Sequence, residues 1–108
     1  MQRQIGEPDW KLFRQLQSLA LERFCQRVLA EVSRLASEAG RSSHERYLAV
    51  FALVERRNQE LAEAFDNPRR STALFQLARL QSEGLLSEEE FARFSAETRG
   101  LVKVLLGG

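Results

Sequence analysis

Apolar residues in the first part of the chain recur every three or four positions, the spacing that places side chains along one face of an α-helix. The pattern opens with Trp10, Phe13, Leu16, Ala20 and Phe24. It continues, in alternating steps of four and three residues, through Leu21, Cys25, Val28, Val32, Leu35 and Ala39. Such alternation is typical of a packed helix seam. We therefore expect a helix over about residues 9–39 that is stopped by Gly40.

A second helix is predicted over about residues 43–65. Ser42 and Glu45 have the spacing of a capping box, in which both side chains satisfy backbone N–H groups at the start of a helix. Behind them the same alternation returns in Tyr47, Phe51, Val54, Asn58, Leu61 and Phe65. Because the link at Gly40-Arg41 is short, we expect the two helices to form an antiparallel hairpin.

Shorter helices should follow over about residues 68–83, 88–94 and 96–106. Their start signals are Asn67-Pro68, Ser87 with Glu90, and Ser95. Gly84 should end the first of them, because glycine readily adopts the left-handed conformation that follows many helices. The predicted fold class is therefore all-α, a long αα-hairpin with two or three shorter helices packed on it.

Composition agrees with this fold and narrows the class of protein. A chain of 108 residues has the length of one domain, rich in strong helix formers. We expect a frayed N-terminus over residues 1–7 and a single helical-bundle domain over residues 8–108. The formal net charge of +1 argues against a dedicated nucleic-acid binder. Arginine outnumbers lysine heavily, which suggests a GC-rich, bacterial genome.

The N-terminal residues lack the apolar core of a signal peptide. Nowhere does an apolar run approach the roughly 20 residues that span a bilayer. We therefore expect a cytoplasmic protein without a membrane partner.

Three consecutive carboxylates, Glu88 to Glu90, are the most conspicuous candidate for chemistry. Adjacent residues of one helix point in different directions and cannot converge on one ion, so a capping box with favourable dipole charges explains them better. The single cysteine, Cys25, and the single histidine, His44, should lie far apart along the hairpin. We expect no metal, no cofactor and no catalytic residues, and hence no enzyme.

The same segment resembles a known family. Its residues match the pattern L-x-x-L-x-x-x-G-L-L-[ST]-x-E-E-F at Leu77, Leu80, Gly84, Leu85, Leu86, Ser87, Glu89, Glu90 and Phe91. This pattern is similar to that of the short C-terminal helical hairpin family called SHOCT, over about residues 77–94. The resemblance implies a helix–turn–helix geometry and a role in oligomerisation or partner binding. Members usually continue with lysines, whereas Phe94 and Ser95 follow here.

Arg69, Arg70, Ser71 and Thr72 form a candidate anion-binding site at the start of the predicted third helix. Guanidinium groups, hydroxyls and free backbone N–H groups at a helix N-terminus together favour phosphate or carboxylate. The alternative is that the two arginines pair with Asp66 and Glu63 around the turn. Arg56 and Arg57 could join the site only if the loop folds back.

The first predicted helix is longer than the second, so Trp10, Leu12 and Phe13 need a cover. It could be the C-terminal helices or a second copy of the chain. Asn58 occupies a seam position, where a polar residue sets register or partner choice. Further candidate interface residues are Leu85, Leu86, Phe91 and Phe94. The sequence thus favours a protein interaction or self-association module, which would be a homodimer if a second copy supplies the cover; the alternative is an anion or nucleic-acid binder using Arg69 and Arg70.

Overall fold

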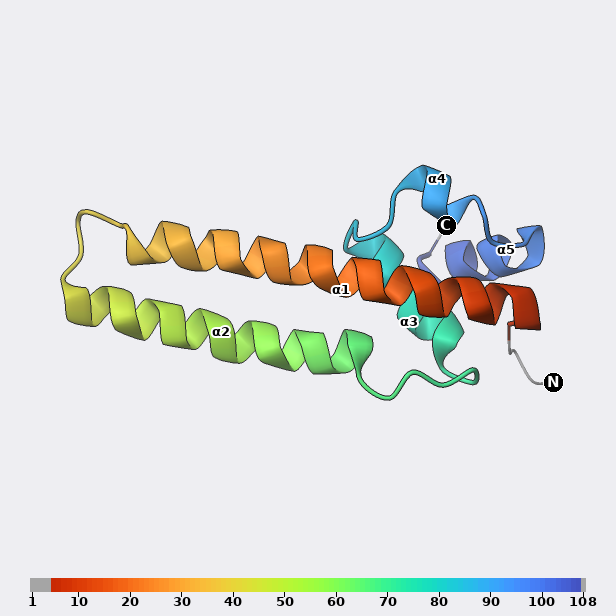
Figure 1. Cartoon of the computed structure of the whole chain (residues 1–108), viewed down its shortest axis with the longest axis horizontal. Coiled ribbons are helices and arrows are strands. Elements are labelled where there is room, and N and C mark those ends of the chain that lie inside the picture. Colours follow the sequence, from red (N-terminus) through yellow and green to blue (C-terminus); the bar gives the residue numbers. More distant parts are fainter. Residues whose placement is uncertain (1–4, 108) are drawn as a thin grey trace.

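A computed structural model describes residues 5–107, which form five α-helices and no strand. They are α1 (Glu7–Ala36), α2 (Ser43–Phe65), α3 (Ala73–Ser82), α4 (Glu88–Phe91) and α5 (Ala96–Leu105). Helices α1 and α2 run antiparallel, and α3, α4 and α5 gather around the N-terminal half of α1 (Figure 1). The far half of the hairpin projects from this cluster, giving extents of 54 × 25 × 25 Å. The predicted all-α fold is confirmed.

Helix α2 begins and ends where the sequence predicts. The Ser42 hydroxyl accepts a hydrogen bond from the Glu45 N–H, and the Glu45 carboxylate accepts one from the Ser42 N–H. Helix α1 ends at Ala36, three residues before the predicted end. The Ser37 hydroxyl donates to the Ser33 carbonyl, and a serine that bonds locally to the backbone competes with helix continuation. Gly40 therefore lies in the loop and does not stop the helix.

The expected frayed N-terminus is wrong for residues 5–7, while residues 1–4 lie outside the described part of the chain. The Ile5 side chain is buried in the core, and α1 already begins at Glu7. The Arg70 Nε donates a hydrogen bond to the Ile5 carbonyl at 3.1 Å. Apolar burial and a long-range hydrogen bond together hold this segment in place.

Helix α3 begins at Ala73, five residues later than predicted. Asn67 has a φ of 53°, in the left-handed region that asparagine tolerates, and so turns the chain away from a helix at Pro68. The Gln76 amide then donates to the Asp66 carbonyl at 3.1 Å and ties α3 to the end of α2. The dipeptide Asn67-Pro68 thus makes a tight turn where we expected a cap and a first helical turn.

Gly84 ends α3 as predicted, through a Schellman motif. The Leu85 N–H donates to the Leu80 carbonyl at 3.0 Å, and the Gly84 N–H donates to the Gln81 carbonyl. Gly84 has a φ of 67°, which favours glycine strongly. Leu85 then turns into the core, and the Ser87 capping box starts α4 three residues later.

Two glycine-to-alanine substitutions should change stability in opposite directions. Gly84→Ala should cost about 1–2 kcal/mol of unfolding free energy, because alanine must adopt a left-handed backbone there. Gly100→Ala should stabilise by up to about 1 kcal/mol, because Gly100 lies inside α5 with no heavy atom near the added Cβ. Urea unfolding of both variants and of wild type measures the two changes in unfolding free energy. Equal effects of the same sign would contradict the assignment of Gly84 as the helix stop.

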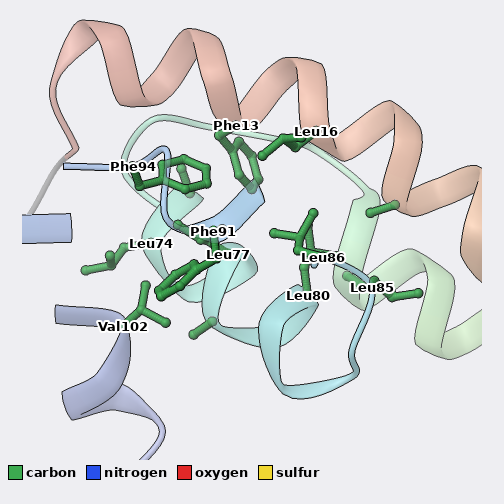
Figure 2. Close-up of a cluster of buried hydrophobic side chains, with 14 of the residues drawn as sticks. Phe13, Leu16, Leu74, Leu77, Leu80, Leu85, Leu86, Phe91, Phe94 and Val102 are labelled. Carbon is green, nitrogen blue, oxygen red and sulfur yellow. The ribbon is translucent and has the colours of Figure 1, made fainter. Parts of the chain in front are cut away.

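The hydrophobic core lies between the N-terminal half of α1 and the C-terminal helices. Figure 2 shows Phe13 and Leu16 of α1 pointing toward Leu77 and Leu80 of α3, with Phe94 beside them. The cover for the first part of α1 is therefore the chain's own C-terminal half, one of the two sources expected from the sequence. Helix α4 ends at Phe91, earlier than predicted, and the chain then turns so that Phe94 reaches this core.

A buried carboxylate joins the two ends of the chain. Asp9 accepts hydrogen bonds from the Ser95 N–H, the Ser95 hydroxyl and the Thr98 hydroxyl, at 3.1, 2.7 and 2.6 Å. Burial raises the pKa of Asp9, but the hydrogen bonds from Thr98 and Ser95 outweigh it, so the pKa lies below its ordinary value. Ser95 also caps α5, by accepting from the Thr98 N–H, as its position predicts.

Two arginines of α1 hold the segment between α3 and α4. Arg27 donates to the carbonyls of Glu83 and Gly84 at 2.6 and 2.8 Å. Arg23 donates to the Leu85 carbonyl and makes a bidentate ion pair with Glu90 at 2.7 and 2.9 Å. The hydrogen bond from Arg23 is the largest of the interactions that lower the pKa of Glu90 to about 2.

This ion pair should make stability depend on pH. A glutamate whose pKa is lowered by folding stabilises the folded state above its ordinary pKa, and that contribution is lost as the pH falls toward the folded value. The urea midpoint should therefore fall between about pH 4.5 and about pH 2. Glu90→Gln, which can still cap the helix, should show a smaller fall than wild type. The exposed Glu89→Gln serves as control, and an equal fall in both variants would contradict this role.

Candidate functional site

Most residues predicted to form an interface are used inside the chain itself. Phe13, Leu85, Leu86, Phe91 and Phe94 are buried in the hydrophobic core. Trp10 and Leu12 are half-buried and pack against that core, with Trp10 stacked on Phe13 at 5.9 Å between ring centroids. The described fold therefore uses the five buried side chains in its own core and leaves Trp10 and Leu12 partly exposed. Asn58 alone among the predicted interface residues is exposed.

The predicted anion site is spread across a turn in which Arg70 and Thr72 already have partners within the chain. Arg70 bonds to the Ile5 carbonyl and pairs with Glu7 at 2.8 Å. The Thr72 hydroxyl donates to the Arg69 carbonyl. Arg69 and Ser71 are exposed. Because α3 begins only at Ala73, its first free N–H groups lie beyond the two arginines.

The arginines also differ from the expected alternative of pairing around the turn. Glu63 pairs with Arg79 at 3.0 Å, and Arg57 pairs with Glu31 at 3.0 Å and with Glu60 at 2.6 Å. The hydrogen bond from Arg57 lowers the pKa of Glu31 and is the largest contribution to that shift. Arg57 is thus committed to the hairpin and does not join Arg70.

The three consecutive glutamates behave as the start of a helix. Glu90 closes the capping box with Ser87, and Glu88 and Glu89 are exposed in the first turn of α4. Among residues 5–107, no three histidine, cysteine, aspartate or glutamate side chains gather as a metal site. Cys25 lines a groove with Asn58 of α2. His44 lies about 21 Å from Asn58 along the same helix, at 1.5 Å per residue, and is therefore far from Cys25.

Helix α2 carries two separate faces. Leu53 is buried against α1, and Arg57 and Glu60 lie on the same side. The predicted seam lies roughly a quarter turn away and is largely uncovered: Tyr47 is 67% exposed, Phe51 57% and Val54 45%. The expectation that this whole seam packs on the first helix is wrong for its N-terminal half. The buried Leu53 and the Arg57–Glu31 ion pair face the first helix instead.

Helix α1 extends this uncovered surface. Leu29 is 67% exposed, and Leu21 is exposed one turn from Cys25. A groove of about 330 Å³ runs between the helices and is lined by Phe24, Cys25, Val28, Leu29, Val54, Arg57, Asn58 and Leu61. We define the hairpin face by the outward residues on this side, which are Leu21, Cys25, Leu29, Val32, Tyr47, Phe51, Val54 and Asn58. None of them is charged.

The opposite side of the hairpin has the reverse chemistry. A groove of about 240 Å³ there is lined mainly by Arg27, Glu31, Arg57, Glu60 and Glu83. These side chains pair with one another or with backbone carbonyls, as Arg27 does with Glu83. One side of the same two helices is therefore a solvated network of charges, and the other is apolar. The hairpin is amphipathic as a unit.

Figure 1 shows that no other element covers the far half of the hairpin, where most of the hairpin face lies. Isolated exposed apolar residues are ordinary, but contiguous apolar patches of this kind commonly mark interaction surfaces. Phe75 of α3 is a useful contrast. It is 63% exposed, but its neighbours one turn away include Ser71, Thr72 and Arg79.

Comparisons with known proteins find no relative of this chain. No family model, no curated protein and no solved structure matches the chain. The resemblance of residues 77–94 to SHOCT hairpins stays a prediction. Within the described residues, no helix is both long and apolar enough to cross a membrane.

The spacing of apolar residues identifies a seam on α2, but much of this seam faces solvent and not α1. Both faces of α2 carry apolar side chains, so spacing alone does not say which face meets α1. The positions of the charges could have shown it. Arg57 and Glu60 lie on the same helical face as Leu53 and Ala64. Glu31 of α1 forms an ion pair with Arg57 across the two helices.

Proposed function

We propose that this protein is a non-enzymatic helical interaction module that binds another protein through the hairpin face. The observation that carries the proposal is the exposure of Leu29, Tyr47, Phe51 and Val54 on one uncharged surface of two packed helices. Binding would remove these side chains from water, and each fully buried large apolar side chain contributes about 1.5–3 kcal/mol. A bacterial source and a cytoplasmic location remain predictions from the sequence.

The rigid part of the molecule supports this use of the hairpin. The core, the Asp9 contacts and the arginines of α1 fix α3, α4 and α5 on the N-terminal half of α1. The remaining half of the hairpin is left as an arm with its own ion pairs. A binding surface built on fixed helices loses little conformational entropy when a partner docks.

The alternative of an anion site at Arg69 and Arg70 has less support. Arg70 is engaged by Ile5 and Glu7, and Thr72 bonds back to its own turn. A phosphate would have to compete with these contacts. We therefore propose only the protein-binding function.

Photo-cross-linking in cells that naturally make the protein tests the proposal. The photoreactive phenylalanine analogue p-benzoylphenylalanine replaces Phe51 on the hairpin face or Phe75 outside it, two phenylalanines of similar exposure. Position 51 should give a discrete protein adduct that position 75 does not give. Absence of any adduct from position 51, or the same adducts from both positions, would overturn the proposed function.

A further inference from the structure

We infer that the occupant of the hairpin face is a second copy of this chain, so that two hairpins pair face to face as a four-helix bundle. This inference rests on the proposed function and names its partner. The first argument is one of shape. Two packed antiparallel helices present half of a four-helix bundle, and the surface that completes such a half is another pair of helices. The chain itself supplies one.

The second argument is the chemistry of the surface. A two-fold interface brings identical patches together, so any charge at its centre would face an identical charge and be repelled. The outward residues of the hairpin face carry none, and the Arg57 guanidinium, which lines the groove between them, is paired with Glu31 and Glu60. Its polar groups include the Asn58 amide and the Tyr47 hydroxyl, and each of these can both donate and accept a hydrogen bond. The face is therefore compatible with itself, whereas the charged groove on the other side has its charges paired internally.

The third argument is area. Helix α1 rises about 23 Å from Leu21 to Ala36, and two packed helices are about 20 Å wide. The projected footprint is therefore about 450 Å² before side-chain relief and flanking residues are counted. Specific interfaces bury about 600–1,000 Å² on each partner, so the side chains that protrude from this flat footprint must supply the difference. The area is therefore comparable with the lower end of the range for a specific dimer.

Asn58 then has a specific place in the assembly. It lies within the apolar face, beside Cys25, Leu61 and Val54 in the groove. In helical assemblies a single polar residue at a seam position selects the register in which it finds a partner. Pairing of Asn58 across the interface would favour one register of the two hairpins over others displaced by a helical turn.

Sedimentation equilibrium of the full chain tests this inference. Wild type should show twice the monomer mass of 12.4 kDa at about 100 µM and should dissociate toward monomer at low micromolar concentration. Phe51→Glu on α2 and Leu29→Glu on α1 should each raise the dimer dissociation constant at least about 100-fold, because each places two unpaired carboxylates in the apolar interface. Phe75→Glu should leave the dissociation constant unchanged. Circular dichroism should show the same helix content in all three variants, since the three side chains are exposed in the monomer.

Other outcomes would contradict pairing of two copies through the hairpin face. A wild type that stays monomeric at about 100 µM, a level at which even a weak dimer forms, would overturn it. So would a dimer that both glutamate variants leave intact, or an assembly that grows beyond two chains. If wild type is monomeric and the photoreactive position 51 captures a different protein, the proposed function stands and this inference fails. If position 51 captures nothing, both fail.

Discussion

Replacing Phe13 by alanine is expected to lower the free energy of unfolding by about 3–5 kcal/mol, the range for removing a fully buried aromatic side chain. Phe13 has no exposed surface and stands at the centre of the core, between α1 and the C-terminal helices. Small domains have only about 5–15 kcal/mol of total stability. The variant should therefore unfold at a much lower urea concentration than wild type.

The matched control for this experiment is Phe75→Ala. The same atoms are removed from a side chain that is 63% exposed, so the expected change is within about 1 kcal/mol. Comparing the two urea midpoints separates burial from residue type. A Phe13 variant no less stable than the Phe75 variant would show that α1 is not packed on the C-terminal helices as described.

Replacing Asp9 by alanine should cost about 2–4 kcal/mol of unfolding free energy. The substitution removes a carboxylate that accepts three hydrogen bonds, and it leaves the buried Thr98 hydroxyl without its acceptor. Because the pKa of Asp9 is lowered in the folded state, this contribution is present above its ordinary pKa and lost as the pH falls below it. Urea unfolding near pH 7, followed by the fluorescence of Trp10, measures the loss.

Glu97→Ala provides the control, because Glu97 is an exposed carboxylate in the first turn of the same helix α5. It should change stability by less than about 1 kcal/mol through its interaction with the helix dipole. Hydrogen exchange should further show that α5 loses protection in the Asp9 variant and keeps it in the Glu97 variant. Equal exchange in both would mean that Asp9 does not hold α5 in place.

Features that depend on neighbouring residues were predictable from the sequence. The capping boxes at Ser42 and Ser87, the cap at Ser95 and the stop at Gly84 each involve residues within a few positions, and the structure confirms all four. The same holds for the order and type of the helices. Local hydrogen bonding and helical spacing leave few alternatives at such positions.

Features that depend on distant partners were not predictable in the same way. The Ile5 side chain is alone in a polar stretch, and only Arg70 and the core, far away in sequence, explain its burial. The three acceptors of Arg23 and Arg27 in the turn after α3 are backbone carbonyls, which no residue pattern identifies. Asn67 could either cap a helix or adopt a left-handed turn, and the contacts of Gln76 favour the turn.

The candidate site was only partly predictable for the same reason. The sequence indicated that the apolar first helix must be covered by other residues, and in the structure the chain's own C-terminal helices cover Phe13. Which face of α2 remains uncovered depends on where the partners of Arg57 lie. The self-association predicted from the sequence therefore now rests on other residues, and Asn58 is common to both interpretations.

The most direct test of the central claim uses the two aromatic residues that occur once each in the chain. Tyr47 lies on the hairpin face, and Trp10 lies at the other end of the molecule, packed on its own core. Labelled with fluorotyrosine and fluorotryptophan, they give one ¹⁹F resonance each. On dilution from high to low micromolar concentration, the Tyr47 resonance should move toward its solvent-exposed position while the Trp10 resonance stays fixed. A Tyr47 resonance that is solvent-exposed at every concentration would contradict burial of the hairpin face by a second copy.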